Sequence, residues 1–286
     1  LALRRGNIGE GRPMLNDLKD MALRLRSGMR IALPVDYAGV AMAMTRPMID
    51  SGLRDLRLVC VPTGGLQVDM LIGAGCVAEV EPSAVSLGEA GGAPRFNAAV
   101  KAGSLRVIDA TCPAVHAGLI AAQKGAPFLS IRGLIGSDVL KNRPDWKVID
   151  NPFSDKPDPV TLIPAIHPDV AIFHAPMADR YGNVWIGRRR ELATMAYASA
   201  ESLVTVDRIY EGNLLEDETL AAGVLPALYV AAIAHVPRGT WPYGLWGEYP
   251  TDTETLMSYA AAARTQEGFD AWMAEPANWQ RQEVTA

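Results

Sequence analysis

Cysteine, long apolar runs and an excess of positive charge are all missing or scarce in this 286-residue chain. The three cysteines, Cys60, Cys76 and Cys112, follow neither a Cys-x-x-Cys spacing nor a Cys/His ligand pattern. The sequence therefore predicts no disulfide framework and no zinc or other metal site. An odd number of thiols beside apolar segments is typical of a reducing compartment, so we expect a cytoplasmic location.

Signals for secretion, membrane insertion or nucleic-acid binding are also missing. The first residues are charged and no apolar run is long enough to span a bilayer, so we expect no membrane association. We expect residues 1–13 to be a poorly structured extension. The 27 Lys and Arg against 32 Asp and Glu give a net charge of −5, which argues against a nucleic-acid partner. The short basic clusters at 4–5 and 188–190 are most simply solvated turns.

What the chain does contain is 49% hydrophobic residues, arranged in alternating strand-like and helix-like segments. This alternation predicts an α/β fold with an open, mainly parallel sheet and helices on both faces. We expect a single domain over residues 14–286, because the strand pattern resumes directly after the Pro-rich stretch 151–164, which we interpret as a long loop. The expected strands are 29–34, 56–62, one or two within 76–87, 105–110, 127–131, 169–176, 182–187 and 202–209. The main expected helices are 14–27, 38–51, 94–102, 115–124 and 191–200.

Glycine-containing loops follow two of these strands, at the edge where open α/β sheets bind ligands. Gly64 and Gly65 follow the strand at 56–62, and Gly136 and Ser137 follow the strand at 127–131. Glycine lets backbone N–H groups approach an anion, so these residues are candidates for ligand binding, although a turn needs no function. A third glycine run carries Glu89. None of them matches a dinucleotide-binding G-x-G-x-x-G or a P-loop.

The stretch HAPMADRYGNVWIG, residues 174–187, places His174 and Asp179 beside a turn. A Ser-His-Asp enzyme would also need a G-x-S-x-G nucleophile elbow, and the chain has none. The pattern favours a hairpin in which Asp179 caps a turn containing Gly182 and Asn183. We expect His174 to be a buried, hydrogen-bonded residue.

Several segments, in the same order, make the chain similar to family I CoA-transferases in the form of their A subunits, of the glutaconate CoA-transferase type. Residues 174–187 resemble the family's AD-x-x-GN segment. Ser130 and Ser137 stand where the family usually has Pro and Thr, and Pro34-Val35-Asp36 stands where it has a Gly-Gly-Phe-like turn. The other resembling segments are GGLQVDMLIGAGCVAEV (64–80), GGAPRFNAAVKAGSLRV (91–107), KGAPFLSIRGLIGSD (124–138) and VPRGTWPYGLWGEYPTDTETLMSY (236–259).

The resemblance implies a two-chain enzyme with the CoA-transferase fold that moves CoA between an acyl-CoA and a carboxylic acid. The nucleophilic glutamate of such enzymes belongs to the B subunit, so we expect a B-type partner in a heterodimer or heterotetramer. Coenzyme A would be a substrate, and no cofactor would be permanently bound. A carboxylate is suited to this chemistry because it serves as both nucleophile and leaving group.

Two other functions stay open. The family also includes paired-subunit hydrolases of steroid degradation that open a ring of a cyclic diketo acyl-CoA, in which a carboxylate of the A-type chain acts. The matching segment here contains Asp109, and Glu89 is the second carboxylate that we would test. A non-catalytic CoA-ester-binding protein is the third possibility. The aromatic loop of Trp241, Tyr243, Trp246 and Tyr249 either lines an acyl pocket or contacts the partner.

Overall fold

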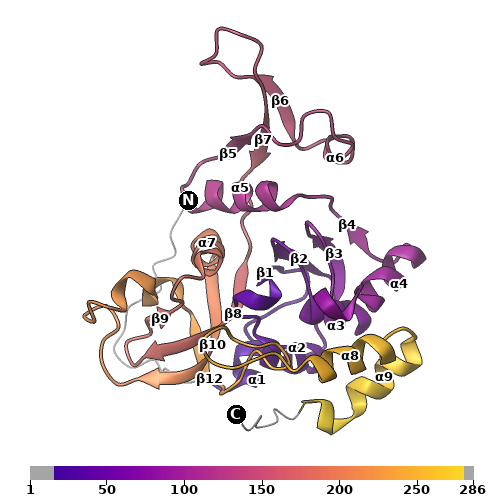
Figure 1. Cartoon of the computed structure of the whole chain (residues 1–286), viewed down its shortest axis with the longest axis vertical. Coiled ribbons are helices and arrows are strands. Elements are labelled where there is room, and N and C mark those ends of the chain that lie inside the picture. Colours follow the sequence, from indigo (N-terminus) through magenta and orange to yellow (C-terminus); the bar gives the residue numbers. More distant parts are fainter. Residues whose placement is uncertain (1–15, 280–286) are drawn as a thin grey trace.

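A computed structural model describes residues 16–279 of the chain, so the extension expected at 1–13 lies outside the described residues. The main body is built around one nine-stranded sheet with the order β11-β9-β8-β1-β2-β3-β4, in which β10 pairs with the other side of β8 (Figure 1). The neighbours β1 to β4, together with β8, β10 and β12, pair in parallel, and β9 pairs in antiparallel register with β8 and β11. The strands are β1 (Arg30–Pro34), β2 (Leu56–Val61), β3 (Val77–Glu81), β4 (Arg106–Val107), β8 (Val170–Asp179), β9 (Val184–Trp185), β10 (Glu201–Tyr210), β11 (Val224–Leu225) and β12 (Ala232–His235).

Helices cover both faces of this sheet, which confirms the α/β prediction. One face buries α1 (Leu18–Ala22), α2 (Thr45–Asp50) and α3 (Leu66–Gly73) in a core cluster with Leu33 and Leu58. The opposite face packs against α5 (Cys112–Gln123) and α7 (Arg190–Ala198). Strands buried on both sides need no polar face, which explains the nearly continuous apolar runs in the sequence. The remaining helices of the body are α4 (Pro94–Ala102), α8 (Thr253–Ala262) and α9 (Gln266–Ala274).

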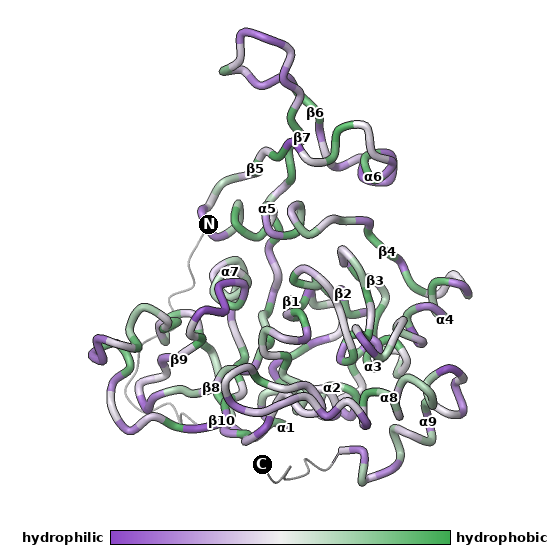
Figure 2. The backbone as a smooth tube through the Cα atoms, viewed as in Figure 1, coloured by the Kyte–Doolittle hydropathy of each residue, from purple (hydrophilic) through white to green (hydrophobic). Residues whose placement is uncertain are grey.

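A second, three-stranded antiparallel sheet stands away from the body, and we call residues 126–164 the arm (Figure 1). Its strands are β5 (Phe128–Ile131), β6 (Lys147–Asp150) and β7 (Pro159–Pro164), with the short helix α6 (Val139–Asn142) between the first two. The interpretation of 151–164 as one long loop is therefore wrong for its second half. Both prolines of β7 lie at the ends of the strand, where they do not interrupt its pairing. Figure 2 shows that the tip of the arm is mostly hydrophilic.

Two of the expected helices are shorter than their apolar periodicity predicted. The described part of the segment 14–27 is helical only over α1. The segment 38–51 consists of two 3-10 turns, η1 (Asp36–Ala38) and η2 (Met42–Met44), followed by α2. Gly39 has a φ of +109° and separates the two turns. By contrast, α4 covers the expected residues, with a proline in its first turn and Gly103 closing it at a φ of +67°.

Candidate active site at the carboxyl ends of the strands

The carboxyl ends of β1, β2 and β3 meet at one edge of the main sheet, and the loops that follow them form the candidate site. Asp36 lies two residues beyond β1, and Gly64 and Gly65 lie beyond β2. The loop after β3 joins them, since the N–H of Gly64 donates to the carbonyl of Ala84 and the N–H of Ser86 donates back to that of Gly64. Three segments far apart in the sequence thus share this edge, as the parallel topology requires.

Asp36 and Gly65 are in direct contact. A Cβ added at Gly65 would lie 1.8 Å from Oδ1 of Asp36, so only glycine leaves room for the carboxylate. The hydroxyl of the buried Tyr243 forms a hydrogen bond with the same carboxylate. Tyr243 is itself held by the backbone N–H of Leu66, the first residue of α3, at 2.8 Å. The sequence singled out Gly65 and the Tyr243 loop but not the carboxylate between them.

The carboxyl of Asp36 has a pKa close to neutral pH. Burial raises the pKa of Asp36 to about 7, and the hydrogen bond from Tyr243 opposes this shift only in part. Among the described residues no Lys, Arg or His forms an ion pair with it. A carboxyl with such a pKa can exchange a proton near pH 7, which is a property of catalytic acids and bases.

Glu89 lies on the outer side of the same edge. It is exposed, in the short 3-10 turn η3 (Gly88–Ala90) of the loop that pairs with Gly64. No hydrogen bond or ion pair of its side chain occurs within the described part of the chain. The Glu89 side chain is therefore accessible to a ligand or a partner, and it stabilises no contact within the described residues.

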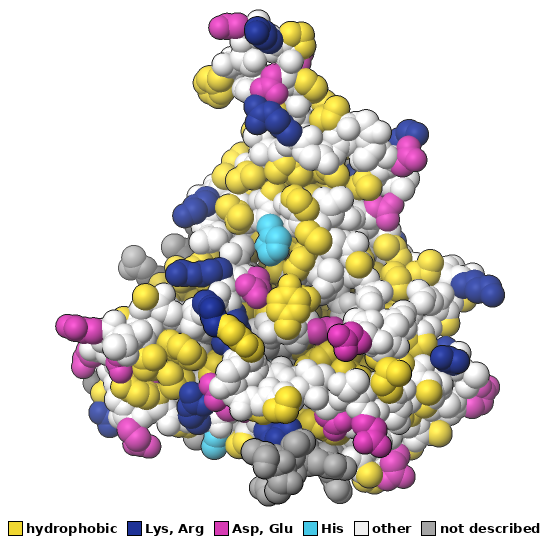
Figure 3. Space-filling view, viewed as in Figure 1, with side chains coloured by type: hydrophobic (Ala, Val, Ile, Leu, Met, Phe, Trp, Pro, Cys, Tyr) yellow, Lys and Arg dark blue, Asp and Glu magenta, His cyan; other side chains and the backbone are white. Residues whose placement is uncertain are grey.

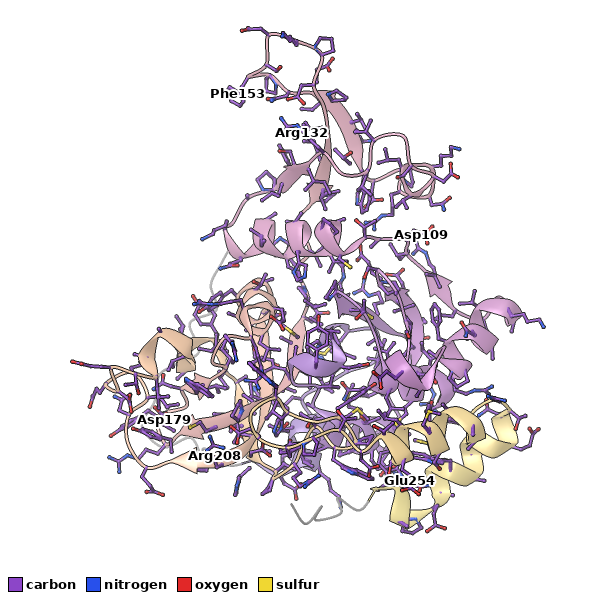
Figure 4. The ribbon with its side chains drawn as sticks, in the orientation of Figure 1. Asp109, Arg132, Phe153, Asp179, Arg208 and Glu254 are labelled. Carbon is purple, nitrogen blue, oxygen red and sulfur yellow. The ribbon has the colours of Figure 1, made fainter. Side chains whose placement is uncertain are left out.

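Asp109 has a different setting, just before α5, where the body lies beside the arm (Figure 4). Its carboxylate accepts a hydrogen bond of 2.6 Å from Nδ2 of Asn142, and its carbonyl accepts one of 2.8 Å from Arg143. The Arg143 guanidinium also pairs with the buried Glu81 at 2.9 Å and stacks on Trp146. Asp109 thus takes part in the junction that attaches the arm.

Gly136 and Ser137 belong to the arm and not to the edge that carries Gly64 and Gly65. Gly136 has a φ of +81°, and the hydroxyl of Ser137 donates to the carbonyl of Leu134 at 2.8 Å, so both residues form a local turn. The two glycine loops that the sequence grouped as ligand-binding candidates lie in separate parts of the molecule, one in the body and one in the arm.

The hairpin at 174–187 is held by Asp179. Its Oδ1 accepts hydrogen bonds from the N–H groups of Tyr181 and Asn183, both at 2.9 Å, and its Oδ2 accepts from the Asn183 amide. Gly182 takes a φ of +88° in this turn. His174 is fully buried on β8, and its Nδ1 lies 2.8 Å from the Thr205 hydroxyl, which confirms the expectation of a buried, hydrogen-bonded histidine.

The other expectations from composition can be compared with the described residues. All three cysteines are free thiols. In the described range 16–279, no group of three or more His, Cys, Asp or Glu side chains is arranged to hold a metal ion. Within that range, no helix combines the length and the apolar character needed to cross a membrane.

Sequence reasoning missed Asp36, although a signal was present. Carboxylates directly beyond buried parallel strands lie at the ligand-binding edge, and Asp36 follows the strand Arg30–Pro34 by two residues. The residues of the aromatic loop also differ in exposure, which the sequence did not predict. Tyr243 and Trp241 are buried, whereas Trp246 is 64% exposed.

Comparison with known proteins assigns the family. Residues 16–235 match the family model described as coenzyme A transferase. The chain is 32% identical over 243 residues to the A subunit of 3-oxoadipate CoA-transferase from Pseudomonas knackmussii, covering 82% of this chain and 83% of that protein. This chain therefore belongs to the coenzyme A transferase family.

Two further similarities bear on the activity. The crystal structure of glutaconate coenzyme A-transferase from Acidaminococcus fermentans superposes with a TM-score of 0.82 at 28% identity, over 91% of this chain and 87% of that one. The cholesterol ring-cleaving hydrolase IpdA subunit of Rhodococcus jostii is 30% identical over 267 residues, covering 90% of this chain and 89% of that protein. The family thus contains similar chains with two different activities.

Proposed function

We propose that this chain is the A subunit of a heteromeric CoA-transferase that moves CoA between an acyl-CoA and a carboxylic acid. The observation that carries this proposal is the similarity to the A subunit of 3-oxoadipate CoA-transferase along more than four fifths of both chains. The edge formed by Asp36, Gly64 and Gly65 supports it, because these residues lie together beyond the carboxyl ends of parallel strands, where open α/β sheets bind ligands.

The chemistry divides the work between two chains. A glutamate of the B-type partner attacks the thioester carbonyl, CoA thiolate leaves, and an acyl anhydride forms. The thiolate then attacks the glutamyl carbonyl and releases the first acid. The second acid repeats these steps in reverse order. In this scheme our chain supplies one wall of the site, and the protonated Asp36 donates a hydrogen bond to a carbonyl oxygen on which negative charge develops.

Several parts of this proposal extend beyond the family assignment. Coenzyme A is a substrate and no cofactor is permanently bound. The assembly is a heterodimer or heterotetramer with the B-type chain. The location is cytoplasmic, which the three free thiols support. Glu89 is a catalytic candidate in the body, and Gly136 and Ser137 are candidate substrate-binding residues in the arm.

The decisive experiment traps the covalent intermediate. The chain is co-expressed with a B-type partner, the complex is incubated with acyl-CoA, and borohydride is added to reduce a glutamyl thioester to an alcohol. Peptide mass spectrometry showing the reduced glutamate on the partner supports the transferase. Full CoA exchange by this chain alone would rule out the two-chain proposal, and ligand binding without turnover with any partner would favour a non-catalytic CoA-ester-binding protein.

A second candidate function is hydrolysis of a ring in a cyclic diketo acyl-CoA, and the similarity to the ring-cleaving hydrolase subunit favours it. In that case a carboxylate of this chain acts, and Asp109 is the first residue to test. Water-dependent loss of the acyl-CoA without any reduced glutamate, together with complete loss of turnover in Asp109→Asn, would support the hydrolase. Unchanged turnover in Asp109→Asn would reject it.

A further inference from the structure

A pocket on the β9–α7 side of the body combines positive charge with exposed aromatic rings. It has a volume of about 490 Å³, within the range of pockets that hold small ligands. Figure 3 shows Lys and Arg side chains beside hydrophobic ones on this part of the face. We call it the Trp–Arg pocket, and the residues that matter for its chemistry are Trp185, Arg188, Arg189, Arg190, Trp246 and Glu248.

The positive charge of this pocket is available to a ligand. Arg188 and Arg190 are exposed, and neither forms an ion pair with a described residue. The carboxylate that lines the pocket, Glu248, already pairs with Arg208, which lies outside the lining. The chain as a whole carries a net charge of −5, so two exposed arginines at the lining of one pocket make a local site for an anion.

The aromatic part of the pocket is held in place. The guanidinium of Arg188 lies 3.6 Å from the centroid of the Trp246 ring, and that indole is still 64% exposed. The buried Arg189 donates to the carbonyl of Trp246 at 2.8 Å and fixes the loop that carries it. Trp185 packs on Gly187 and Gly223, where a Cβ would approach its ring to about 3 Å. The hairpin capped by Asp179 leads directly into these residues.

We propose that the Trp–Arg pocket binds a phosphorylated adenosine group. Guanidinium planes and aromatic rings are the surfaces on which purine bases stack, and arginine is well matched to phosphate oxygens. A simple anion would not need two indoles, and an apolar ligand would not need two exposed arginines. Two sources share this chemistry: the phosphoadenosine end of coenzyme A, which rests on the proposed function, and a free adenine nucleotide, which does not.

Calorimetric titration of the complex of this chain with its partner tests the proposal. The ligands are coenzyme A, adenosine 3′,5′-bisphosphate, ATP and inorganic pyrophosphate. The variants are Arg188→Ala and Trp246→Ala, both at exposed positions, and the control is Arg106→Ala, which removes one exposed arginine at the other end of the sheet. We expect each pocket variant to weaken nucleotide binding about tenfold while the control leaves it unchanged.

The competition pattern identifies the source. Mutual competition of coenzyme A and adenosine 3′,5′-bisphosphate, with a raised KM for acyl-CoA and an unchanged kcat in Arg188→Ala, assigns the pocket to coenzyme A. Binding of ATP that coenzyme A does not displace assigns it to a free nucleotide. Nucleotide binding that neither variant affects, or pyrophosphate binding as tightly as the nucleotides, overturns the proposal. Nucleotide binding here in a complex that turns over no acyl-CoA would defeat the transferase and leave this inference standing.

Discussion

The body and the arm both consist of β-sheet, but they bury their side chains to very different degrees. All ten residues of β8 in the body are buried, whereas all four residues of β6 in the arm are exposed. The difference lies in what covers the strands, because α5 and α7 pack on one face of the body sheet and α1 to α3 on the other. The arm sheet has α5 on one side and a single small cluster of apolar residues between them, made by Ala114, Ala117, Leu134, Trp146 and Ile163.

The two regions also differ in how they hold buried charge. In the body, the carboxylate of Asp36 is half-buried, with the Tyr243 hydroxyl as its partner and no ion pair to any described cation. At the base of the arm, the buried Glu81 lies between Arg30 and Arg143. Removing a cation that pairs with a buried carboxylate is costly, whereas a desolvated carboxyl that lacks a cation has a raised pKa and makes the site sensitive to pH.

Removing the cation at the base of the arm should have the largest effect. Arg143→Ala deprives Glu81 of one partner and removes the bonds to Asp145 and to the Asp109 carbonyl. Glu81 then keeps only Arg30, and the Trp146 ring loses the guanidinium stacked on it, so we expect a loss of about 3 to 4 kcal/mol, toward the lower end of the cost of breaking a buried ion pair. Amide hydrogen exchange should show faster exchange in β5, β6 and β7, with less change in β8 and β10.

The control for this prediction is Arg132→Ala, within the same arm. Arg132 pairs with Asp158 at 2.7 Å, but its side chain is 69% exposed. Exposed pairs contribute little, so we expect a loss of under about 1 kcal/mol. Equal effects of the two variants would mean that the junction is no more important than any surface pair of the arm.

The second prediction concerns the carboxylate of Asp36, which forms no ion pair with a described residue. The pKa of Asp36 is about 7 in the folded chain and 3.8 in its ordinary setting. Between these values the folded state binds more protons than the unfolded one, so stability falls as pH rises through this window and stays lowered above pH 7. Asp36→Asn removes this loss. We expect the variant to match the wild type near pH 4 and to exceed it by about 2 to 4 kcal/mol at pH 8.

Urea unfolding at several pH values between 4 and 8 measures this effect. Asp50→Asn, which changes an aspartate of α2 with a 56% exposed side chain, is the matched control and should show no comparable trend. Parallel stability curves for Asp36→Asn and the wild type would contradict the burial of a carboxyl with a raised pKa. In the active complex, Asp36→Asn should also remove the pH dependence of turnover near pH 7.

The contrast between the regions explains what could be predicted from sequence. Strands such as β2 are covered on both faces and appear in the sequence as apolar runs, so the fold of the body could be predicted. The helix α4 could be predicted because a proline lies in its first turn and a glycine follows its last residue. For the segment of β7 the sequence predicts a loop, because prolines and the polar residues before it are typical of turns. The raised pKa of Asp36 could not be predicted from the sequence, since the residues that enclose its carboxylate, Gly65 and Tyr243, lie distant in sequence.

The third prediction separates a structural role of Asp109 from a catalytic one. Its carboxylate accepts a hydrogen bond from Asn142 within the junction, and the amide oxygen introduced by Asp109→Asn can still accept it without the negative charge, so the variant should lower the stability by less than about 1 kcal/mol. Under the transferase proposal Asp109 takes no part in the chemistry, so kcat of the complex should change less than about threefold, which corresponds to about 0.65 kcal/mol. The matched variant Asn142→Ala removes this hydrogen bond altogether. A kcat that falls only in Asp109→Asn would contradict the structural role.

The smallest effect on this chain is expected at the tip of the arm. Phe153 is 95% exposed, and Figure 4 shows it at the far end from the body. Its ring has almost no contact to lose within the chain, so Phe153→Ser should change the free energy of unfolding by less than about 0.5 kcal/mol. Unfolding of the isolated chain measures this, and a loss above about 1 kcal/mol would show that the ring packs against the chain. If the stability is unchanged while the complex with a B-type chain dissociates more easily, the Phe153 ring contacts the B-type chain, because it has almost no contact within its own chain.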